Sequence, residues 1–356
     1  MRITAVEVTP LDLHLQTALT VAYGSYPSLE YALLKLHTDE GLIGLGEAAS
    51  DPAVTGETQA GVIRALQRAA AFLVGSDPFD SESLVVHALR ELAGYPAAIA
   101  AIDMALYDLM GQALRAPVHR LLGGKARPAA ALYPVIPLDE PATMAAMSQR
   151  FVELGATVLK VKLGSSPADD LARLTTIRHV VGSDIRLRLD INQGWRDAAT
   201  TLATIDALRG FAIDWIEQPV AAHDLAGLAA VSAAVDIPIM ADESCHGPEA
   251  ALQIACTHAA DMINIKLMKC GGIRQAVRML AIADAAGLPC ILGSMGESSI
   301  GSAAGLHFMV ANPSLVACEL LGPLFITNDP ATGYQVDMTT FQAIPSDAPG
   351  LGVQLR

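Results

Sequence analysis

The sequence predicts an α/β protein in which an α+β domain precedes a barrel of repeated βα units. Three observations support this prediction: alternating polarity in the first fifty residues, a helical period in the next seventy, and then a long repeat of strand-like and helix-like runs. The strand-like runs recur every 24 to 28 residues, which is about the length that a strand, a loop and a helix need. Each run closes with a polar residue: Lys162, Asp190, Glu217, Asp242, Lys266 and Ser294.

The N-terminal part of the chain has the pattern of a small sheet followed by helices. Residues 1–50 alternate apolar and polar positions, and a turn at 39–41 separates two strand-like runs, which predicts an antiparallel meander. Beyond Gly56, apolar residues stand three and four positions apart, as on one face of a helix. We therefore expect a domain over residues 1–125 whose helices cover 58–74, 81–93 and 96–114.

The repeating units predict a barrel over residues 126–325. Its strands are expected at 157–162, 185–190, 213–217, 237–242, 262–266 and 289–294, with further candidates within 128–137 and at 315–320. Its helices are expected at 141–155, 168–181, 198–209, 226–234, 248–257 and 272–287. After Pro323 the period is lost, and short strand-like runs predict a C-terminal segment, 326–356, that packs back on the first domain.

Composition and charge narrow the class of protein. The chain has 356 residues, 52% of them apolar, and a net charge of −14, which argues against nucleic acid and anionic membranes as partners. No apolar run is long enough for a membrane helix, and the alternating start lacks the apolar block of a signal peptide. Five cysteines without a Cys-x-x-Cys pair suit a reducing compartment, so we expect a cytoplasmic protein.

Three acids close successive strands of the predicted barrel, and the carboxyl ends of barrel strands converge on one mouth. Asp190, Glu217 and Asp242 are therefore expected to be neighbours in space. Three carboxylates that close together repel one another, and an all-oxygen ligand set suits a hard divalent cation such as Mg²⁺, with Mn²⁺ as a substitute. The alternative is that they are three unrelated acids at the starts of surface loops.

Two lysines close strands on opposite walls of the predicted barrel. Lys162 ends the second strand of the count and Lys266 the sixth, so each could face one bound molecule from a different side. A lysine beside a cation and a second lysine loses proton affinity and can act as a base. Lys160 shares a strand face with Lys162 and could hold an anion. The alternative is an ion pair from each lysine to the nearby acids.

A set of motifs resembles the enolase superfamily, specifically the muconate lactonizing enzyme subgroup, which includes muconate cycloisomerases and dipeptide epimerases. The motifs are Lys-Val-Lys162, Asp190-Ile-Asn192, Glu217-Gln-Pro219, Ala241-Asp-Glu-Ser244 and Ile265-Lys-Leu-Met-Lys-Cys-Gly-Gly272. The resemblance implies a capping domain, a modified TIM barrel and a C-terminal return to the cap. It also implies that the three acids bind Mg²⁺, that Lys162 and Lys266 are the acid/base pair, and that Lys160 assists the substrate carboxylate.

The reaction that the resemblance implies is removal of a proton next to a substrate carboxylate, through an enolate that the metal stabilises. Lysines on both faces permit racemisation or epimerisation of an amino-acid derivative or dipeptide, whereas one lysine suffices for cycloisomerisation of a muconate-like dicarboxylate. A lyase of the same superfamily, a dehydratase or an o-succinylbenzoate synthase, is the alternative. A Schiff-base aldolase and a non-catalytic binding protein fit the acids less well. We expect a small carboxylate substrate and a homo-oligomer.

Two segments bear on the substrate and disagree. Residues 46–58 resemble the capping-domain stretch of dipeptide epimerases, which carry Asp-x-Asp at the eighth strand to grip the substrate ammonium. This chain instead has Cys318-Glu-Leu-Leu-Gly-Pro-Leu324, which is similar to muconate cycloisomerases. Glu319 stands for the first acid but Leu321 replaces the second, so a free α-ammonium would lack a counter-charge. The alternative is that both segments only support packing.

Further contacts to the substrate are expected from two loops. The glycines and serines of 293–301, Ser294 among them, offer amides and hydroxyls to an anion, and Glu297 matches a glutamate that hydrogen-bonds around the site in the subgroup. The alternative for Glu297 is a solvated loop acid. Tyr23 and Tyr26 lie in an N-terminal segment that could close over the mouth as a lid, although Tyr-Gly-Ser-Tyr is also ordinary loop sequence.

Overall fold

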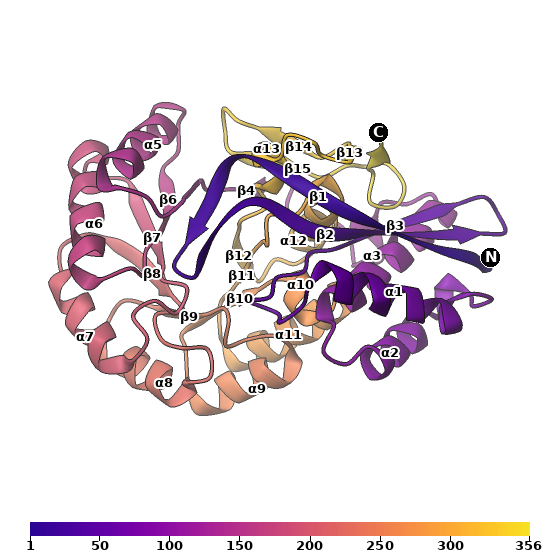
Figure 1. Cartoon of the computed structure of the whole chain (residues 1–356), viewed down its shortest axis with the longest axis horizontal. Helices are drawn as coiled ribbons and strands as arrows, with labels where there is room; N and C mark the ends of the chain where they lie inside the picture. The colour runs from indigo at the N-terminus through magenta and orange to yellow at the C-terminus, as the bar shows by residue number, and fades with distance from the viewer.

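The computed structural model describes all 356 residues, and it has two main parts (Figure 1). A capping domain is built on an antiparallel sheet of β1 (Ile3–Val21), β2 (Gly24–Thr38) and β3 (Ile43–Ala48). A barrel of parallel strands with surrounding helices follows it. No helix has both the length and the apolar character needed to span a membrane.

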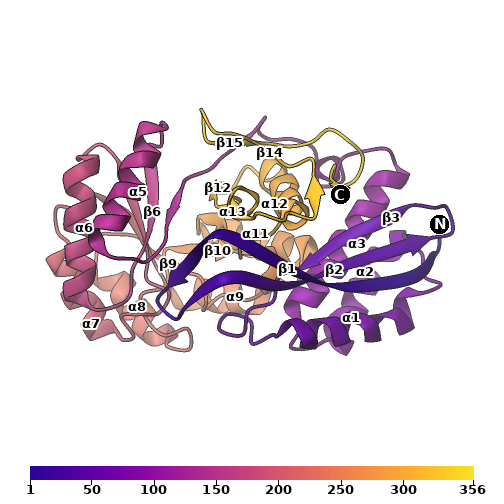
Figure 2. The ribbon, with the colours of Figure 1, turned by 45° about the horizontal axis from the view of Figure 1, so that its top comes forward.

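The first hairpin is longer than the sequence pattern indicates. The predicted turn at 39–41 is confirmed, since it lies between β2 and β3. In addition, Ala22 and Tyr23 connect β1 to β2, whose register ends at the Val21–Gly24 pair. The β1–β2 ribbon extends from the capping domain across the barrel (Figures 1 and 2). Tyr23 therefore lies at the tip of a hairpin and not in an irregular loop.

The helices of the capping domain follow the sheet, as predicted. They are α1 (Gln59–Leu73), α2 (Ser81–Glu91), α3 (Pro96–Ala113) and the short α4 (Val118–Leu121), with a 3₁₀ turn at Pro78–Asp80. The Thr58 side chain accepts a hydrogen bond from the Gly61 amide at 3.2 Å and so caps α1. Buried apolar residues of these helices pack on one face of the sheet.

Helix α3 lies unusually close to β3 because two strand positions are glycine. A Cβ on Gly46 would stand 2.0 Å from the Ala101 carbonyl oxygen, and one on Gly44 would stand 2.4 Å from that of Ala105. The close fit holds β3 against the helix. The next β3 residue, Glu47, can then reach the barrel.

Glu47 joins the capping domain to the catalytic end of the barrel. Its carboxylate accepts hydrogen bonds from the amides of Ser298, at 2.9 Å, and Gly301, at 3.0 Å, at the start of α12 (Ser299–Ala311). A carboxylate at a helix N-terminus is favoured by the unpaired amides there. Burial, partly offset by these hydrogen bonds, raises the pKa of Glu47 to about 7.

The barrel contains eight parallel strands whose spatial order follows the chain. They are β5 (Val135–Ile136), β6 (Val158–Lys162), β7 (Arg186–Asp190), β8 (Ile213–Glu217), β9 (Ile239–Ala241), β10 (Met262–Ile265), β11 (Cys290–Leu292) and β12 (Leu315–Cys318). A parallel bridge between Leu132 and Cys318 brings the first and last strands together. The predicted α/β fold, a capped and modified TIM barrel, is thus confirmed.

Helices connect the strands on the outside of the barrel (Figure 1). The six predicted ones appear as α5 (Pro141–Glu153), α6 (Pro167–Val181), α7 (Ala198–Ala207), α8 (Leu225–Ala234), α9 (Pro248–Thr257) and α11 (Ile273–Ala286). The pattern does not predict α12, which is buried on nearly every side and so shows no polar face. Two single turns, α10 (Leu267–Cys270) and α13 (Gly322–Phe325), follow β10 and β12.

The C-terminal segment returns to the capping domain, as predicted. Its short strands are β13 (Ala331–Thr332), β14 (Gln335–Asp337), β15 (Gln342–Ile344) and β16 (Gln354–Leu355), and β15 also pairs with β4 (Ala130–Ala131). The Thr327 amide donates to the His14 carbonyl at 2.8 Å, and the Leu351 amide donates to Asp108 at 2.9 Å. The domain boundaries at 125/126 and 325/326 stay predictions.

Candidate active site

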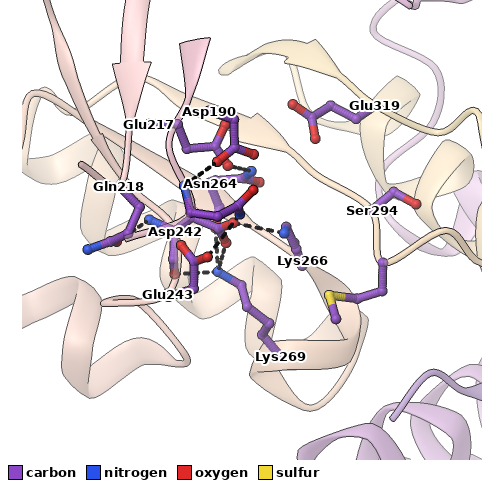
Figure 3. A network of polar contacts seen from close by, with 12 residues as sticks. Asp190, Glu217, Gln218, Asp242, Glu243, Asn264, Lys266, Lys269, Ser294 and Glu319 are labelled. Carbon is purple, nitrogen blue, oxygen red and sulfur yellow. Dashed lines mark hydrogen bonds and ion pairs between the residues drawn. The ribbon is translucent and has the colours of Figure 1, made fainter. Parts of the chain in front are cut away.

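Three predicted acids meet at the carboxyl ends of adjacent strands. Asp190 ends β7, Glu217 ends β8 and Asp242 directly follows β9, and all three are fully buried at 0% exposure. One carboxylate oxygen of each lies within 4.8 Å of the others (Figure 3). The strand register thus brings the acids of three separate chain segments into one cluster, as the sequence predicts.

Two lysines of β6 neutralise part of this cluster. Lys160 Nζ lies 2.9 Å from Asp190 Oδ2 and 2.7 Å from Glu217 Oε2. Lys162 Nζ lies 2.6 Å from Asp190 Oδ2 and 3.0 Å from Asn192 Oδ1. The alternation argument that places both lysines on one strand face is therefore confirmed. The ion pairs of the alternative interpretation are present as well, so the lysines and the acids form one network.

Asp242 is held by two lysines from the other side. Lys266, which directly follows β10, places Nζ 2.8 Å from Asp242 Oδ2. Lys269, on α10, pairs with Asp242 Oδ1 and also donates to the Asn264 carbonyl at 3.2 Å (Figure 3). Lys269 has no predicted role, although its position one helical turn beyond Lys266 places both on one side of α10.

Two further side chains at the site carry buried oxygens that have no hydrogen-bond partner. The Asn264 amide nitrogen donates to Glu217 Oε1 at 2.8 Å, which leaves Asn264 Oδ1 without a partner. Asn192 donates to Glu243 Oε1 at 3.0 Å, which leaves Glu243 Oε2 without a partner. The same alternation argument would identify Asn264, because it stands two residues before Lys266 on one strand face.

The donor set fits a divalent cation. The three clustered acids offer only oxygen atoms, which are the ligands that Mg²⁺ prefers. The two unpartnered oxygens of Asn264 and Glu243 lie in the same network and add to its unsatisfied negative potential. No histidine or cysteine belongs to the cluster, so a softer transition metal would lack its usual ligands.

A strained backbone position fixes the loop that carries Asp242. Gln218 has a φ of 38°, and its side-chain oxygen accepts hydrogen bonds from the amides of Asp242 and Ser244, each at 3.0 Å. Left-handed geometry at a residue other than glycine costs free energy and persists where the surroundings enforce it. Here the Gln218 amide ties the end of β8 to the end of β9, so that neighbouring acids keep their spacing.

The acids of the cluster do not share one protonation tendency. Burial opposes ionisation of Asp190, but Lys160 and Lys162 outweigh it and lower its pKa to about 2. Burial and the charge of Asp190 raise the pKa of Glu217 well above its ordinary value. Burial and the charges of Asp242 and Asp190 raise that of Glu243 to about 7. The pKa values of carboxyl groups that share one buried site differ in this way unless a cation neutralises the carboxylates.

The pKa of Lys266 differs from the sequence-based expectation of a lowered value. Burial favours the neutral amine, but the carboxylates of Asp242 and Glu217 outweigh it and raise the pKa above the ordinary value. The expected lowering requires the charge of Asp242 to be neutralised by something other than the lysine itself. The pKa of Lys266 therefore depends on whether a cation neutralises the charge of Asp242.

A cavity of about 120 Å³ brings the predicted residues to one place, which we call the catalytic cavity. Three of the four lysines that pair with the acids line it, and so do most of the predicted substrate contacts. These residues are Lys160, Lys162, Lys266, Tyr23, Ser294, Glu319 and Leu321. Tyr26 and Asp51, both from the capping domain, complete the wall above the barrel. The β1–β2 ribbon therefore supplies part of the cover over the mouth.

Glu297 does not line the catalytic cavity, although the sequence suggests a contact with substrate. Its carboxylate accepts hydrogen bonds from the Ser294 hydroxyl and, at 3.0 Å, from the Met295 amide. Ser294 and Met295 themselves face the cavity. Glu297 is thus a buried support for the loop that follows β11, and it is not a solvated acid.

The eighth strand places its acid and its leucine differently. Glu319 Oε1 accepts hydrogen bonds from Lys160 Nζ and from the Tyr133 hydroxyl, both at 2.8 Å. Its charge is therefore already paired inside the barrel. Leu321 is 4% exposed and also lines the cavity. No unpaired acid of the eighth strand is left for a substrate ammonium.

A capped parallel barrel with three clustered acids and two opposed lysines defines a class of enzyme: metal-dependent acid–base catalysts that act on a carboxylate substrate. Comparison with family profiles agrees with this class. The profile "Mandelate racemase / muconate lactonizing enzyme, N-terminal domain" matches residues 3–123, and the profile "Enolase C-terminal domain-like" matches residues 143–356. The chain belongs to the mandelate racemase/muconate lactonizing enzyme family of the enolase superfamily, as its motifs predict.

Three characterised relatives match over nearly the full length of the chain. The N-succinyl-L-Arg/Lys racemase of Bacillus cereus is 37% identical over 100% of this chain and 96% of its own, and its crystal structure superposes with a TM-score of 0.97. The hydrophobic dipeptide epimerase of Enterococcus faecalis is 37% identical over 99% of both chains, and its complex with Mg and L-Leu-L-Tyr gives a TM-score of 0.95. A chloromuconate cycloisomerase of Pseudomonas putida is 32% identical over 100% of this chain and 97% of its own. The chain is accordingly an enolase-superfamily isomerase.

Proposed function

We propose that this isomerase racemises or epimerises an amino acid whose α-amino group is acylated. The observation that supports this choice is the pairing of Glu319 with Lys160 and Tyr133, together with Leu321 on the cavity wall. A free α-ammonium would enter a cavity whose eighth-strand acid is already neutralised and whose second position is apolar. An unpaired buried ammonium is costly, whereas an amide is neutral and needs only hydrogen bonds.

Two opposed lysines suit an exchange of the α-proton between faces. Lys162 ends β6 and Lys266 follows β10, and four steps of the eight-stranded order separate these strands. Half a barrel therefore lies between the two ammonium groups, yet both line the catalytic cavity. A planar intermediate held between them can lose a proton to one lysine and gain one from the other.

Asp190, Glu217 and Asp242 would hold Mg²⁺, and Mn²⁺ has the same oxygen preference. When bound, the cation supplies a Lewis acid that stabilises the negative charge developing on the substrate carboxylate as the α-proton leaves. With the charge of Asp242 taken up, Lys266 is released from its ion pair and can face the α-carbon as the neutral amine. A cation on Asp190 would likewise release Lys162 from its ion pair.

Lys160 has a different task from the other two lysines. Burial opposes its charge, but Asp190, Glu217 and Glu319 outweigh the burial and raise its pKa well above the ordinary value. Glu319, which accepts from Lys160 Nζ at 2.8 Å, does not belong to the three acids that would hold the cation, so Lys160 keeps one counter-charge and stays an ammonium that does not act as a base. Its positive charge next to the acid cluster can stabilise a substrate carboxylate.

Asp51 provides the capping domain's charge in the cavity. Its Oδ1 accepts from the Ala53 amide at 2.7 Å and the Val54 amide at 3.2 Å, and its Oδ2 makes no hydrogen bond. The free oxygen, with the Tyr26 ring on the same wall, suits a cationic substrate side chain. We therefore place N-acylated lysine or arginine among the preferred substrates, in line with what the Bacillus cereus relative is named for.

Cycloisomerisation of a muconate-like dicarboxylate is the second candidate function. The same Leu321 favours it, since a substrate without nitrogen needs no counter-charge there, and the Pseudomonas putida relative is named for a reaction of this kind. In that reaction one lysine would be essential for proton transfer and the other would act through its charge. Lyase activity has no structural observation of its own in favour of it.

We also propose that the protein works in a reducing compartment. All five cysteines are free, four of them buried, which is consistent with a reducing compartment such as the cytoplasm. A homo-oligomer remains a prediction, and light scattering on the purified protein would test it.

Isotope exchange tests the proposed function. The enzyme is incubated with Mg²⁺ in D₂O with N-acetyl-L-lysine, N-acetyl-L-leucine, L-Ala-L-Glu or a muconate, and ¹H NMR follows the α-proton or the lactone product. We expect exchange with the N-acetyl compounds, and faster exchange for lysine than for leucine. Dipeptide turnover at a kcat/KM of roughly 10⁴ M⁻¹s⁻¹ or more, without turnover of the N-acetyl compounds, would refute the proposal.

A further inference from the structure

One buried tyrosine of the barrel interior has no part in the reaction proposed above. Tyr133 follows β4, is 3% exposed, and packs in an apolar layer of the barrel that includes Trp215 and Met240. Its hydroxyl donates a hydrogen bond to Glu319 Oε1 at 2.8 Å. Burial and the charge of Glu319 raise the pKa of the Tyr133 hydroxyl well above its ordinary value, so the hydroxyl stays a neutral donor.

A buried arginine holds the ring of Tyr133. Arg188, on β7, is 7% exposed, and its guanidinium carbon lies 4.1 Å from the centre of the Tyr133 ring and 3.9 Å from that of the Trp215 ring. A guanidinium over an aromatic face is attracted to the ring. Arg188 Nε also lies 3.4 Å from Asp214 Oδ2, which fixes the guanidinium itself. The protein thus fixes the ring of Tyr133, and with it the direction of the hydroxyl.

One oxygen of Glu319 receives both hydrogen bonds that reach its carboxylate. Tyr133 and Lys160 each donate to Oε1 at 2.8 Å, and Oε2 has no partner in the protein. Without the Tyr133 hydroxyl, Lys160 would be the single partner of the carboxylate, which could then turn about its last bond. The hydroxyl therefore sets the orientation of the Glu319 carboxylate.

The position of the Lys160 ammonium depends on Glu319 once a cation is bound. Three carboxylate oxygens lie 2.7 to 2.9 Å from Lys160 Nζ, which is as many as the ammonium has N–H groups; they belong to Asp190, Glu217 and Glu319. Asp190 and Glu217 are among the acids that would hold the cation, whereas Glu319 is not. Glu319 is then the contact that keeps the ammonium in place, and Tyr133 keeps Glu319 in place.

We propose that Tyr133 is a positioning residue of the reaction: through Glu319 it fixes the Lys160 ammonium where negative charge develops on the substrate carboxylate. This inference rests on the proposed function, in which Lys160 stabilises that charge. An ammonium that is fixed in advance stabilises the charge without reorganisation during the reaction. Loss of the Tyr133 hydroxyl should therefore slow the chemical step more than it weakens substrate binding.

Substitution Tyr133→Phe tests the proposal, because it removes the hydroxyl and keeps the ring that contacts Arg188. Exchange of the α-proton of N-acetyl-L-lysine is followed by ¹H NMR in D₂O with Mg²⁺, and kcat and KM are determined separately. We expect kcat to fall about tenfold, which is the size of one hydrogen bond to a charged group, and KM to change by less than about twofold. Circular dichroism should be unchanged.

Tyr334→Phe is the matched control. The Tyr334 hydroxyl donates at 2.6 Å to the carbonyl of Leu320, the residue next to Glu319, and does not contact the Glu319 side chain. This variant also loses a tyrosine hydrogen bond to the eighth-strand segment, but the Glu319 carboxylate keeps both of its partners. Its kcat should therefore match that of the unmodified enzyme.

A double-mutant cycle separates positioning from general packing. In a Glu319→Ala background, Tyr133→Phe should have no further effect on kcat, because the hydroxyl no longer has a carboxylate to orient. An unchanged kcat in Tyr133→Phe, the same loss in both backgrounds, or an equal loss in Tyr334→Phe would overturn the role of Tyr133 alone. Absence of exchange by the unmodified enzyme with every N-acetyl amino acid would overturn the proposed function, and this inference with it.

Discussion

The substitution Lys269→Met should destabilise the folded protein more than any surface change, because it breaks a buried ion pair from one side. Lys269 is fully buried, and its ammonium contacts Asp242 Oδ1, the Asp242 carbonyl and the Asn264 carbonyl. Methionine has a similar volume, so the change removes charge and leaves packing nearly intact. Removing one partner of a buried pair costs about 3–5 kcal/mol, and in this variant Lys266 alone would be left to balance Asp242, which lies among the other buried acids of the cluster.

The assay is equilibrium unfolding in urea, followed by circular dichroism in the presence of a chelator. Lys35→Met is the matched control, since Lys35 pairs with Glu7 at 2.9 Å on the surface, where an ion pair contributes about 0–1 kcal/mol. We expect the free energy of unfolding to fall by about 3–5 kcal/mol for Lys269→Met and by less than about 1 kcal/mol for Lys35→Met. Equal losses in the two variants would refute the description of Asp242 as a charge held by two lysines.

Three other changes test separate parts of the structure. Glu217→Gln should weaken Mg²⁺ binding by about tenfold or more in calorimetry, because it removes one of three anionic ligands, while circular dichroism stays unchanged; unaltered affinity would reject Glu217 as a ligand. Since burial raises the pKa of Glu47 to about 7, the folded protein binds the Glu47 proton more tightly than the unfolded chain does. The free energy of unfolding should therefore fall as pH rises from about 4.5 to 7. Glu47→Gln should reduce this dependence on pH, as measured by urea unfolding at several pH values. Leu321→Asp should raise the kcat/KM for free dipeptides, relative to that for N-acetyl amino acids, by about tenfold or more. An unchanged ratio would show that the side chain at position 321 does not contact the α-amino group.

The catalytic end of the barrel could be predicted because one regularity locates it. Polar residues that close apolar strands must point to the mouth when the strands are parallel, so Asp190, Glu217 and Asp242 are placed by register alone. The same reasoning places the two lysines at the mouth, and the sequence motifs identify the family. What alternation predicts is the face and the end of a strand, and the structure agrees at each of these positions.

Residues outside that regularity were harder to predict. Lys269 follows Lys266 by one turn of a four-residue helix, which has too few residues to show a period. Helix α12 is buried on nearly every side, so it has no polar face whose period the sequence could show. Glu297 turns toward Ser294 and away from the cavity, which depends on the path of a loop. The raised pKa of Lys266 depends on distances that a sequence does not contain.

The measurement that most directly tests the central claim is α-proton exchange by Lys162→Ala and Lys266→Ala with each enantiomer of an N-acyl-lysine. Both lysines line the catalytic cavity from strands half a barrel apart, so each should serve one face of the α-carbon. We expect one variant to lose exchange of one enantiomer while the other enantiomer still exchanges, and the second variant to show the inverse pattern. Rates in both variants equal to those of the unmodified enzyme would contradict the assignment of the two lysines as the acid/base pair.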